Sequence, residues 1–407
     1  MMKSLIIEIN MFKKHLINGL ILLPFIWLST GMLILRNGDK TMVAMIIISV
    51  ITTLLVYGLT TLKNNISTNK LLWLLFIICG YFLFSYYYHG LSSREIRSFI
   101  AATLLVAIFP SSLLTKKVII TLTVISAVIS FCFAYFCMIY MHWSRDAWPI
   151  NAIPYGTLIA GISVIALSLC LTLTNYKEKA VTFLAFILSS YGLIITESRG
   201  VWLGFIFALA VIFIVFITTK KIKITWRSTV ITLILIIGVS IMSKPLITQR
   251  VSQTQQEYSD ITSGDLNTSF GLRLQMWQSA PMIIEHHELL GQGNQYLQVL
   301  DKLYDQKRIS NYLYINQPPH FHNQYVDYVV KKGIVGLILL LCLLILPLRL
   351  LKNTSTLQRY ITISLVSLFA VAALTDVPLN HGQTIFMYIF WLGCFTTTSN
   401  NEHADND

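Results

Sequence analysis

Residues 42–55 read MVAMIIISVITTLL, a run of fourteen residues without a charge. Similar apolar runs fill most of the 407-residue chain, which is 55% hydrophobic and 12% charged and has a mean hydropathy of +0.67. No ordinary soluble domain of this size has such a composition. The runs lack the alternation of a membrane β-barrel and are long enough for spanning helices of about 20 residues. The sequence therefore predicts an all-α polytopic membrane protein.

Twelve apolar segments are candidates for transmembrane helices. Nine of them come before one long polar segment and three come after it. We therefore expect helices one to nine in residues 1–243, a large outside loop or cap with helices of its own in 244–324, helices ten to twelve in 325–398, and a tail in 399–407. The expected spans are 16–35, 41–62, 71–88, 98–114, 118–141, 156–174, 180–196, 201–219, 228–243, 333–351, 360–375 and 384–398.

The distribution of basic residues predicts the orientation. Sixteen lysines and arginines fall on the side of the N-terminal segment, whereas the short loops on the other side hold six: Arg36, Lys40, Arg94, Arg97, Arg145 and Arg199. Basic residues favour the cytoplasmic side, so both termini are expected inside the cell and the large loop outside it. The net charge of +12 is assigned to this anchoring, and no motif indicates nucleic-acid binding. No cleavable signal peptide is expected.

The large loop should have structure, because a structureless segment of this length is unusual. A helix is expected over 272–290, with Leu272, Met276 and Ile283 near one apolar face and Pro281 as a kink. Gly291-Gln292-Gly293 is expected to form a flexible turn. A second helical stretch over 321–330 is expected to run into the tenth span.

Four ionisable residues far apart in sequence all fall on the predicted outer side: Arg199, Arg273, His322 and Asp376. Ionisable groups at a membrane face are costly, so such a cluster is a functional-site hypothesis. Arginine suits phosphate because its planar fork donates two parallel hydrogen bonds, and a position in a first helical turn would add backbone donors. Histidine can exchange a proton near neutral pH. A carboxylate such as Asp376 can orient a histidine or an arginine.

Each candidate also has a purely structural alternative. Arg199 can form an ion pair with neighbouring Glu197, Arg273 can be a paired surface residue, and Asp376 can simply end a helix. His320 and His322 could ligate a metal, but no carboxylate or cysteine at close spacing completes the ligand set, and we expect no metal and no cofactor. Arg94 and Arg145, in other outside loops, are candidates for steering an anionic substrate.

The order of these features resembles the O-antigen ligase family. An outside Arg199-Gly200 turn is followed by a large loop with Arg273-x-x-x-Trp277 and Gly291-x-Gly293, then by His322-Asn323 and the glycine pair Gly333 and Gly336. The resemblance implies that Arg199, Arg273 and His322 are catalytic and that Asp376, His320, Asn323 and Trp277 help to bind substrate. One departure is the pair Lys331-Lys332, where the family often has an acidic residue.

The resemblance also implies a reaction. Such enzymes are metal-independent glycosyltransferases that move a glycan from undecaprenyl pyrophosphate to a sugar hydroxyl of lipid A–core, at the periplasmic face of the bacterial inner membrane. This step completes lipopolysaccharide, and the partners implied are the lipid-linked O-antigen, lipid A–core and membrane lipid. Three alternatives stay open: an O-antigen polymerase with the same donor, a protein O-oligosaccharyltransferase, and a polysaccharide transporter or flippase. The absence of a visible repeat and the one-sided charges disfavour transport.

Overall fold

The computed structural model describes residues 2–219, 244, 247–317 and 319–395, and throughout these residues the chain is helical without a strand. Residues 247–262 are helical as well. The main helices are α1 Met2–Ile21, α2 Leu23–Ser29, α3 Gly38–Tyr57, α4 Thr60–Thr68, α5 Lys70–His89, α6 Ser93–Ile108, α7 Lys116–Tyr135, α8 Ala152–Thr172, α9 Tyr176–Ile195, α10 Arg199–Thr219, α12 Ser269–Ile284, α13 Tyr296–Asp305, α14 Asn311–Ile315, α15 Gln324–Arg349, α16 Thr356–Ala372 and α17 Gly382–Phe390.

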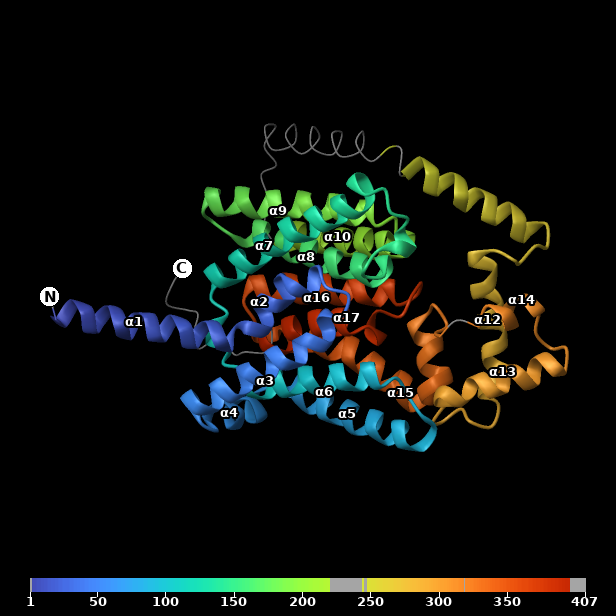
Figure 1. The fold of residues 1–407 in the computed structure, drawn as a ribbon, viewed down its shortest axis with the longest axis horizontal. Coiled ribbons are helices and arrows are strands. Elements are labelled where there is room, and N and C mark those ends of the chain that lie inside the picture. Colours follow the sequence, from blue (N-terminus) through green and yellow to red (C-terminus); the bar gives the residue numbers. More distant parts are fainter. Residues whose placement is uncertain (1, 220–243, 245–246, 318, 396–407) are drawn as a thin grey trace.

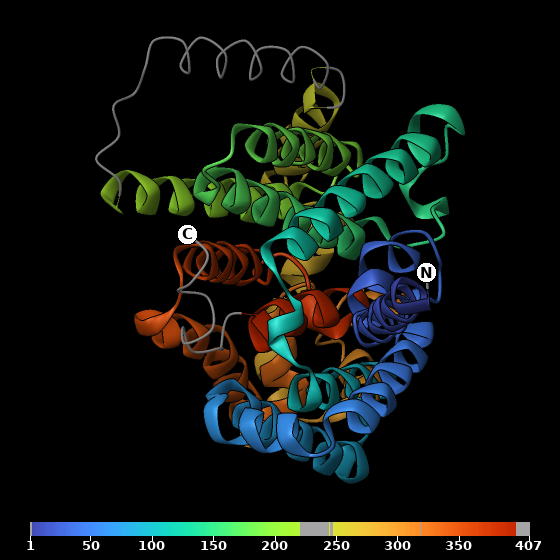
Figure 2. The same ribbon diagram turned by 90° about the vertical axis from the view of Figure 1, so that its left-hand side faces the viewer.

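The bundle has two groups of helices with α17 between them (Figures 1 and 2). On one side α8 packs against α7, α9, α10 and α16, and on the other side α6 packs against α3 and α5. Helix α17 contacts both α6 and α8. Gly161 permits the close approach of α17 to α8, because a Cβ there would lie 2.7 Å from Met387. The centre of the molecule is therefore where α6, α8 and α17 meet.

Among the described residues, seven helices are long and apolar enough to cross a membrane, or eight if the pair 12–21 and 23–33, bent by 65°, is one span. Most predicted spans coincide with one of these helices. The spans expected at 98–114, 360–375 and 384–398 correspond to α6, α16 and α17, which are shorter than the about 20 residues that a straight span needs. The span expected at 228–243 lies outside the described residues. The chain is a multi-pass membrane protein, and the count of twelve stays a prediction.

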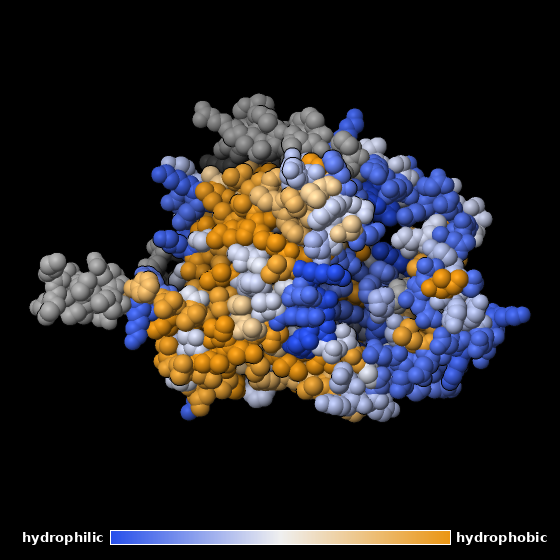
Figure 3. Space-filling model, viewed as in Figure 1, coloured by the Kyte–Doolittle hydropathy of each residue, from blue (hydrophilic) through white to orange (hydrophobic). Residues whose placement is uncertain are grey.

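Helices α12, α13 and α14 form a layer at one end of the bundle, opposite the start of α1 (Figure 1). They have an apolar cluster of their own around Met276, Ile283, Leu300, Leu313 and Phe321. The expected apolar face of the first loop helix is thus confirmed, although this helix ends at Ile284 and keeps Pro281 in its last turn. Figure 3 shows a largely hydrophilic surface at this end and a largely hydrophobic surface over the bundle.

Helix α15 is broken at Gly333, whose backbone is left-handed with φ 64° and ψ −168°. The turn after α12 fits against this break: the amide N of Ile334 donates to the carbonyl of Glu288 at 2.8 Å. A Cβ on Gly291 would lie 2.5 Å from the Gly333 nitrogen. The expected turn over 291–293 is thus packed against the break in α15, at a distance that only glycine allows.

Candidate functional site

His322 and Asp376 form a hydrogen-bonded pair at the loop end of the bundle. The Nδ1 atom of His322 lies 3.3 Å from a carboxylate oxygen of Asp376, which follows α16. Burial alone would raise the pKa of Asp376, but the His322 hydrogen bond and the nearby His381 and His320 lower it to about 2. The carboxylate is therefore ionised at neutral pH, and it accepts from Nδ1 while the Nε2 atom of His322 is left for another partner.

The backbone at His322 is held in a conformation that is rare outside glycine, with φ 48°. Helix α15 begins only at Gln324, so the expectation of a helix from residue 321 is wrong. The reason is a cap: the side-chain oxygen of Asn323 accepts from the amides of Tyr325 and Val326 at 3.0 and 3.2 Å. Asn323, expected to bind substrate, thus uses its amide oxygen to start α15 and to place His322 just outside it.

Two further residues fix the segment before His322. The indole of Trp277 donates to the carbonyl of Phe321 at 2.8 Å, and the amide of Phe321 donates to the buried carboxylate of Asp327 at 3.2 Å. Asn380 donates to the other oxygen of Asp327 at 2.7 Å. Trp277 was expected to bind substrate, and its indole N–H is used to hold the segment before His322. Asp327 was not expected at all, since nothing in its sequence setting distinguishes it from a surface acid.

His320, His322 and Asp376 could together hold a metal ion, because their ligand atoms all lie within 4.8 Å of one another. The rings of His320 and His322 are 4.3 Å apart, and the Nδ1 atom of His320 is buried without a partner. Burial lowers the pKa of His320 to about 4, which keeps the imidazole neutral and able to bind a metal. The premise that no carboxylate completes this set is wrong, because Asp376 arrives from a distant segment.

Arg199 begins α10 and pairs with the helix over 247–262. One guanidinium nitrogen lies 3.0 and 3.2 Å from the two carboxylate oxygens of Glu257, and another donates to Thr254 at 2.7 Å. The structural alternative for Arg199, an ion pair with neighbouring Glu197, is wrong. Glu197 has a left-handed backbone, with φ 52°, and its carboxylate accepts instead from Arg250, which also lies on the 247–262 helix.

Arg145 joins this group from the loop before α8. Its guanidinium donates to the backbone carbonyl of Glu197 at 3.3 Å, and burial together with the charge of Arg250 lowers its pKa. Arg145 and Arg250 therefore contact Glu197 in the turn that Arg199 ends, and these three residues are called the arginine group. Arg250 was missed by sequence analysis, and the only signal would have been its spacing from Thr254 and Glu257, which puts all three on one helix face.

Arg273, on α12, is near enough to both Asp376 and Arg199 for their charges to act on it. It is half-buried and has no hydrogen bond or ion pair within the described part of the chain. Burial lowers the pKa of its guanidinium, and the charges of Asp376, Arg199 and Glu257 act on it as well. Because α12 begins at Ser269, Arg273 is not in the first helical turn, so the expected backbone donors do not accompany it. Arg273 is thus a cation available to an anion.

A polar cavity of about 790 Å³ opens beside the histidine pair. Its charged or titratable lining residues are Arg36, Arg94, Arg145, Asp146, His322 and His381. Arg94 lines it while pairing with the buried Asp39 at 2.5 and 3.0 Å, so the expected position of Arg94 and Arg145 near the site is supported by the geometry. Arg36 and His381 were not expected here. Trp148 is buried and also lines this cavity.

The two lysines before Gly333 are buried and paired. Lys332 lies 2.9 Å from the buried Glu95 of α6, and Lys331 lies 2.9 Å from Asp327. A buried ion pair orients its partners strongly, because separating them would leave a charge without solvent. The carboxylate of Glu95 on α6 is therefore paired with the lysine just before the break in α15.

The fold and the site together define a multi-pass helical membrane protein with a cationic, histidine-containing cavity at one end. Residues 184–341 match the model of a family described as O-Antigen ligase. Through this region the chain is similar to the O-antigen ligase family. The match includes Arg199, Arg273, His320, His322 and Asn323, and it excludes Asp376, Arg94 and Arg145. The match supports a function of ligase or polymerase type.

The chain is also similar to an uncharacterized protein of Haemophilus influenzae Rd. The two sequences are 29% identical over 273 residues, which cover 63% of this chain and 65% of the relative. The chain thus spans slightly less than two thirds of the length of that relative.

Proposed function

We propose that the protein is an O-antigen ligase. It transfers a glycan from undecaprenyl pyrophosphate to a sugar hydroxyl of lipid A–core, at the periplasmic face of the bacterial inner membrane. The observation that carries the proposal is that Arg273, without a hydrogen bond or ion pair among the described residues, is close enough to both Asp376 and Arg199 for their charges to act on it, while Asp376 is paired with His322. A cation that can bind phosphate is thus near a proton acceptor, in a region that matches the O-antigen ligase family model.

The donor would place its diphosphate between Arg199 and Arg273. As the bond between the glycan and the diphosphate breaks, negative charge grows on the leaving oxygen, and each guanidinium stabilises it by a few kcal/mol. An apolar groove of about 740 Å³ supports a place for the isoprenoid chain. The groove is lined by Trp202, Ile206 and Leu209, which follow Arg199 along α10, so an amphiphile with its diphosphate on Arg199 would extend its chain down this helix.

The acceptor hydroxyl would lie against His322. The Nε2 atom takes the hydroxyl proton while the hydroxyl oxygen forms a bond to the anomeric carbon, and the diphosphate leaves with the electron pair of the broken bond. The ionised Asp376 stabilises the imidazolium that results, because it already accepts from Nδ1. General-base assistance of this kind contributes roughly 10²–10⁴-fold. No step requires a metal or a nucleoside triphosphate, so EDTA should leave transfer in vitro unchanged.

The orientation follows from the same arrangement. The loop helices α12, α13 and α14 lie at one end of the bundle, with the start of α1 at the other (Figure 1). Trp277 of α12 holds the segment before His322 through the carbonyl of Phe321. Lys116 and Glu178 pair at 3.5 Å where α7 and α9 begin, which joins two segments of the expected cytoplasmic side. We place both termini in the cytoplasm and the 247–323 segment, with the cavity, in the periplasm.

The test uses a Gram-negative strain without its own ligase, complemented with the wild-type chain, Arg273→Ala or His322→Ala. The matched controls are Arg308→Ala and His287→Ala, two exposed residues of the same loop. Lipopolysaccharide is separated on a gel beside a blot for protein level, and lipid-linked polymer is quantified. We expect the two site variants to lose the whole O-antigen ladder, including core with a single repeat, while lipid-linked polymer accumulates. Both controls should keep the ladder.

Other outcomes identify other functions. Core that still carries one repeat, with only the longer chains lost, would replace the ligase by a polymerase. Loss of lipid-linked glycan from the periplasmic leaflet would indicate a flippase. A wild-type chain that restores the ladder and site variants that do the same would refute the roles of Arg273 and His322.

A further inference from the structure

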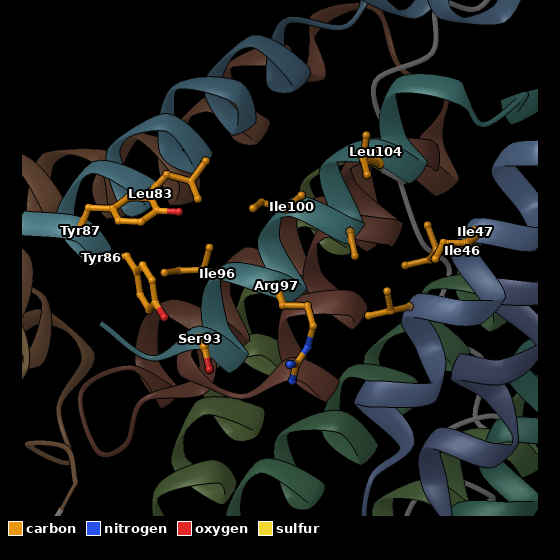
Figure 4. A pocket seen from close by; sticks show the side chains of 12 residues that line it. Ile46, Ile47, Leu83, Tyr86, Tyr87, Ser93, Ile96, Arg97, Ile100 and Leu104 are labelled. Atoms are coloured by element: carbon orange, nitrogen blue, oxygen red, sulfur yellow. The ribbon is translucent and has the colours of Figure 1, made fainter. Parts of the chain in front are cut away.

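A second apolar groove, of about 360 Å³, lies between α3, α5 and α6. Figure 4 shows Leu83, Ile100 and Leu104 toward one end of it and Tyr86, Ser93 and Arg97 toward the other. Its apolar lining is partly exposed, with Leu104 at 48% and Tyr86 at 40%. The groove is therefore amphipathic along its length, with a long apolar part and one cationic end.

Arg97 is the feature that gives this groove a ligand preference. It is exposed, and in the part of the chain that the structure describes it has neither a hydrogen bond nor an ion pair. Arg94, one turn earlier on α6, is neutralised by Asp39. An unpaired guanidinium beside an apolar groove at a membrane favours an anion that it can bind by charge-assisted hydrogen bonds. The hydroxyls of Ser93 and Tyr86 at the same end can add to such a site.

The first turns of α6 stand between this groove and the polar cavity. Arg97 lines the groove, whereas Arg94 lines the cavity that also contains His322. Glu95, between them in sequence, is tied to Lys332 of α15 and fixes this part of α6 in place. A molecule whose apolar chain fills the groove therefore has its polar head at the entrance to the cavity.

The groove is also on the far side of the bundle from the one along α10. Helices α9 and α10 lie on one side and α5 and α6 on the other, in both views (Figures 1 and 2). Two amphiphilic substrates of one reaction could thus reach the cavity from opposite sides of the helix bundle, both within the bilayer, without competing for the same surface.

We propose that the groove between α3, α5 and α6 binds the acceptor, an acylated and phosphorylated glycolipid. An acyl chain lies along Ile100 and Leu104, a phosphate contacts Arg97, and the saccharide extends over α6 into the cavity toward His322. The assignment of this lipid as the acceptor rests on the proposed function. The binding of an acyl chain with an adjacent phosphate does not rest on that function, because it is inferred from the groove and Arg97 alone.

The test is photo-crosslinking in membranes. A benzoylphenylalanine is placed at Leu104 in the His322→Ala background, so that capture does not depend on transfer. Adducts are identified by mass spectrometry. We expect the glycolipid acceptor to be captured well above its share of the membrane lipid. The matched probe at Ile206, in the groove along α10, should not capture it.

Arg97→Glu should then lower acceptor capture at Leu104 about tenfold, the value of one charge-assisted hydrogen bond. Lys40→Glu, an equal charge change at an exposed residue outside the groove, should have no effect. Arg97→Gln is the second variant in case the glutamate disturbs folding. In transfer assays Arg97→Glu should raise the acceptor KM about tenfold, with the donor KM unchanged.

Capture of bulk phospholipid at Leu104 in proportion to its abundance would overturn the proposal. Capture of acceptor that is indifferent to both Arg97 variants would overturn the role of the arginine. Failure of the ligase function has a different signature: transfer would be absent in the wild-type chain, whereas the lipid captured at Leu104 would still be a phosphorylated, acylated glycolipid, enriched over its share of the membrane lipid.

Discussion

Replacement of Asp376 by asparagine should slow glycosyl transfer without weakening substrate binding. The asparagine side chain has nearly the same volume, and its oxygen can still accept from Nδ1 of His322, so the geometry of the pair is retained. What is lost is the negative charge that faces the histidine. If His322 becomes an imidazolium in the transition state, this charge stabilises the transition state more than the ground state.

The magnitude follows from the pKa of Asp376. A value of about 2 in place of 3.8 means that the surroundings favour the carboxylate over the neutral acid by about 2.4 kcal/mol. Since burial alone would have raised the pKa, the attraction to the neighbouring histidines is at least this large. Loss of about 2.4 kcal/mol from the transition state corresponds to a rate lower by about 60-fold.

The assay is transfer by purified protein in nanodiscs, with donor and acceptor varied separately. We expect Asp376→Asn to lower kcat about 60-fold and to leave both KM values within about twofold. Asp305→Asn, at an exposed loop position, is the control for loss of one acidic group. An unchanged kcat would refute the reasoning. A raised KM with normal kcat would show that Asp376 only binds substrate.

Three further results are expected. Arg273→Ala should lower kcat by about 10²–10³-fold, and Arg273→Lys should recover only part of it because lysine lacks the planar fork; Arg308→Ala stays at wild-type rate. Because the pKa of His320 is lowered, the unfolded chain binds a proton between about pH 6.5 and 4 that the folded chain does not bind. The free energy of unfolding should therefore fall by about 2 kcal/mol from pH 7 to pH 5. Chemical unfolding of His320→Gln should lack this pH dependence. Gly333→Ala places a Cβ 2.2 Å from a backbone carbonyl at a positive φ and should lower the thermal midpoint strongly, whereas Gly80→Ala, with open space around it, should not; equal midpoints would contradict the tight contact.

Much of the fold follows from hydropathy alone. Apolar runs of helical length predicted α3, α5, α7, α8, α9 and α10 within a few residues, and the part of α15 after its break, because a bilayer tolerates little besides an unbroken apolar helix. The break in α15 did not follow, since Gly333 looks like any packing glycine until the turn at 288–292 lies against it. Nor did the start of α15, which depends on whether Asn323 caps the helix or faces a substrate.

The sequence predicted which residues form the site better than it predicted which of these residues pair with each other. Arg199, Arg273, His322 and Asp376 stood out because charge is rare near a bilayer, and the structure brings them to one end of the bundle. Which acid meets which base is a different question, decided by packing between helices. Glu197 is beside Arg199 in sequence, yet its left-handed backbone directs its carboxylate to Arg250 and leaves Arg199 to Glu257.

The contact between Arg199 and Glu257 has a consequence for turnover. Under the proposed function, a diphosphate donor would have to displace Glu257 from Arg199, so donor binding would exchange one anion for another. The net affinity would be smaller than that of a guanidinium without a partner, and the displaced Glu257 would stay nearby on its helix. After transfer, the same carboxylate would compete with the lipid diphosphate product for the arginine. Such competition would weaken donor binding and speed release of the product.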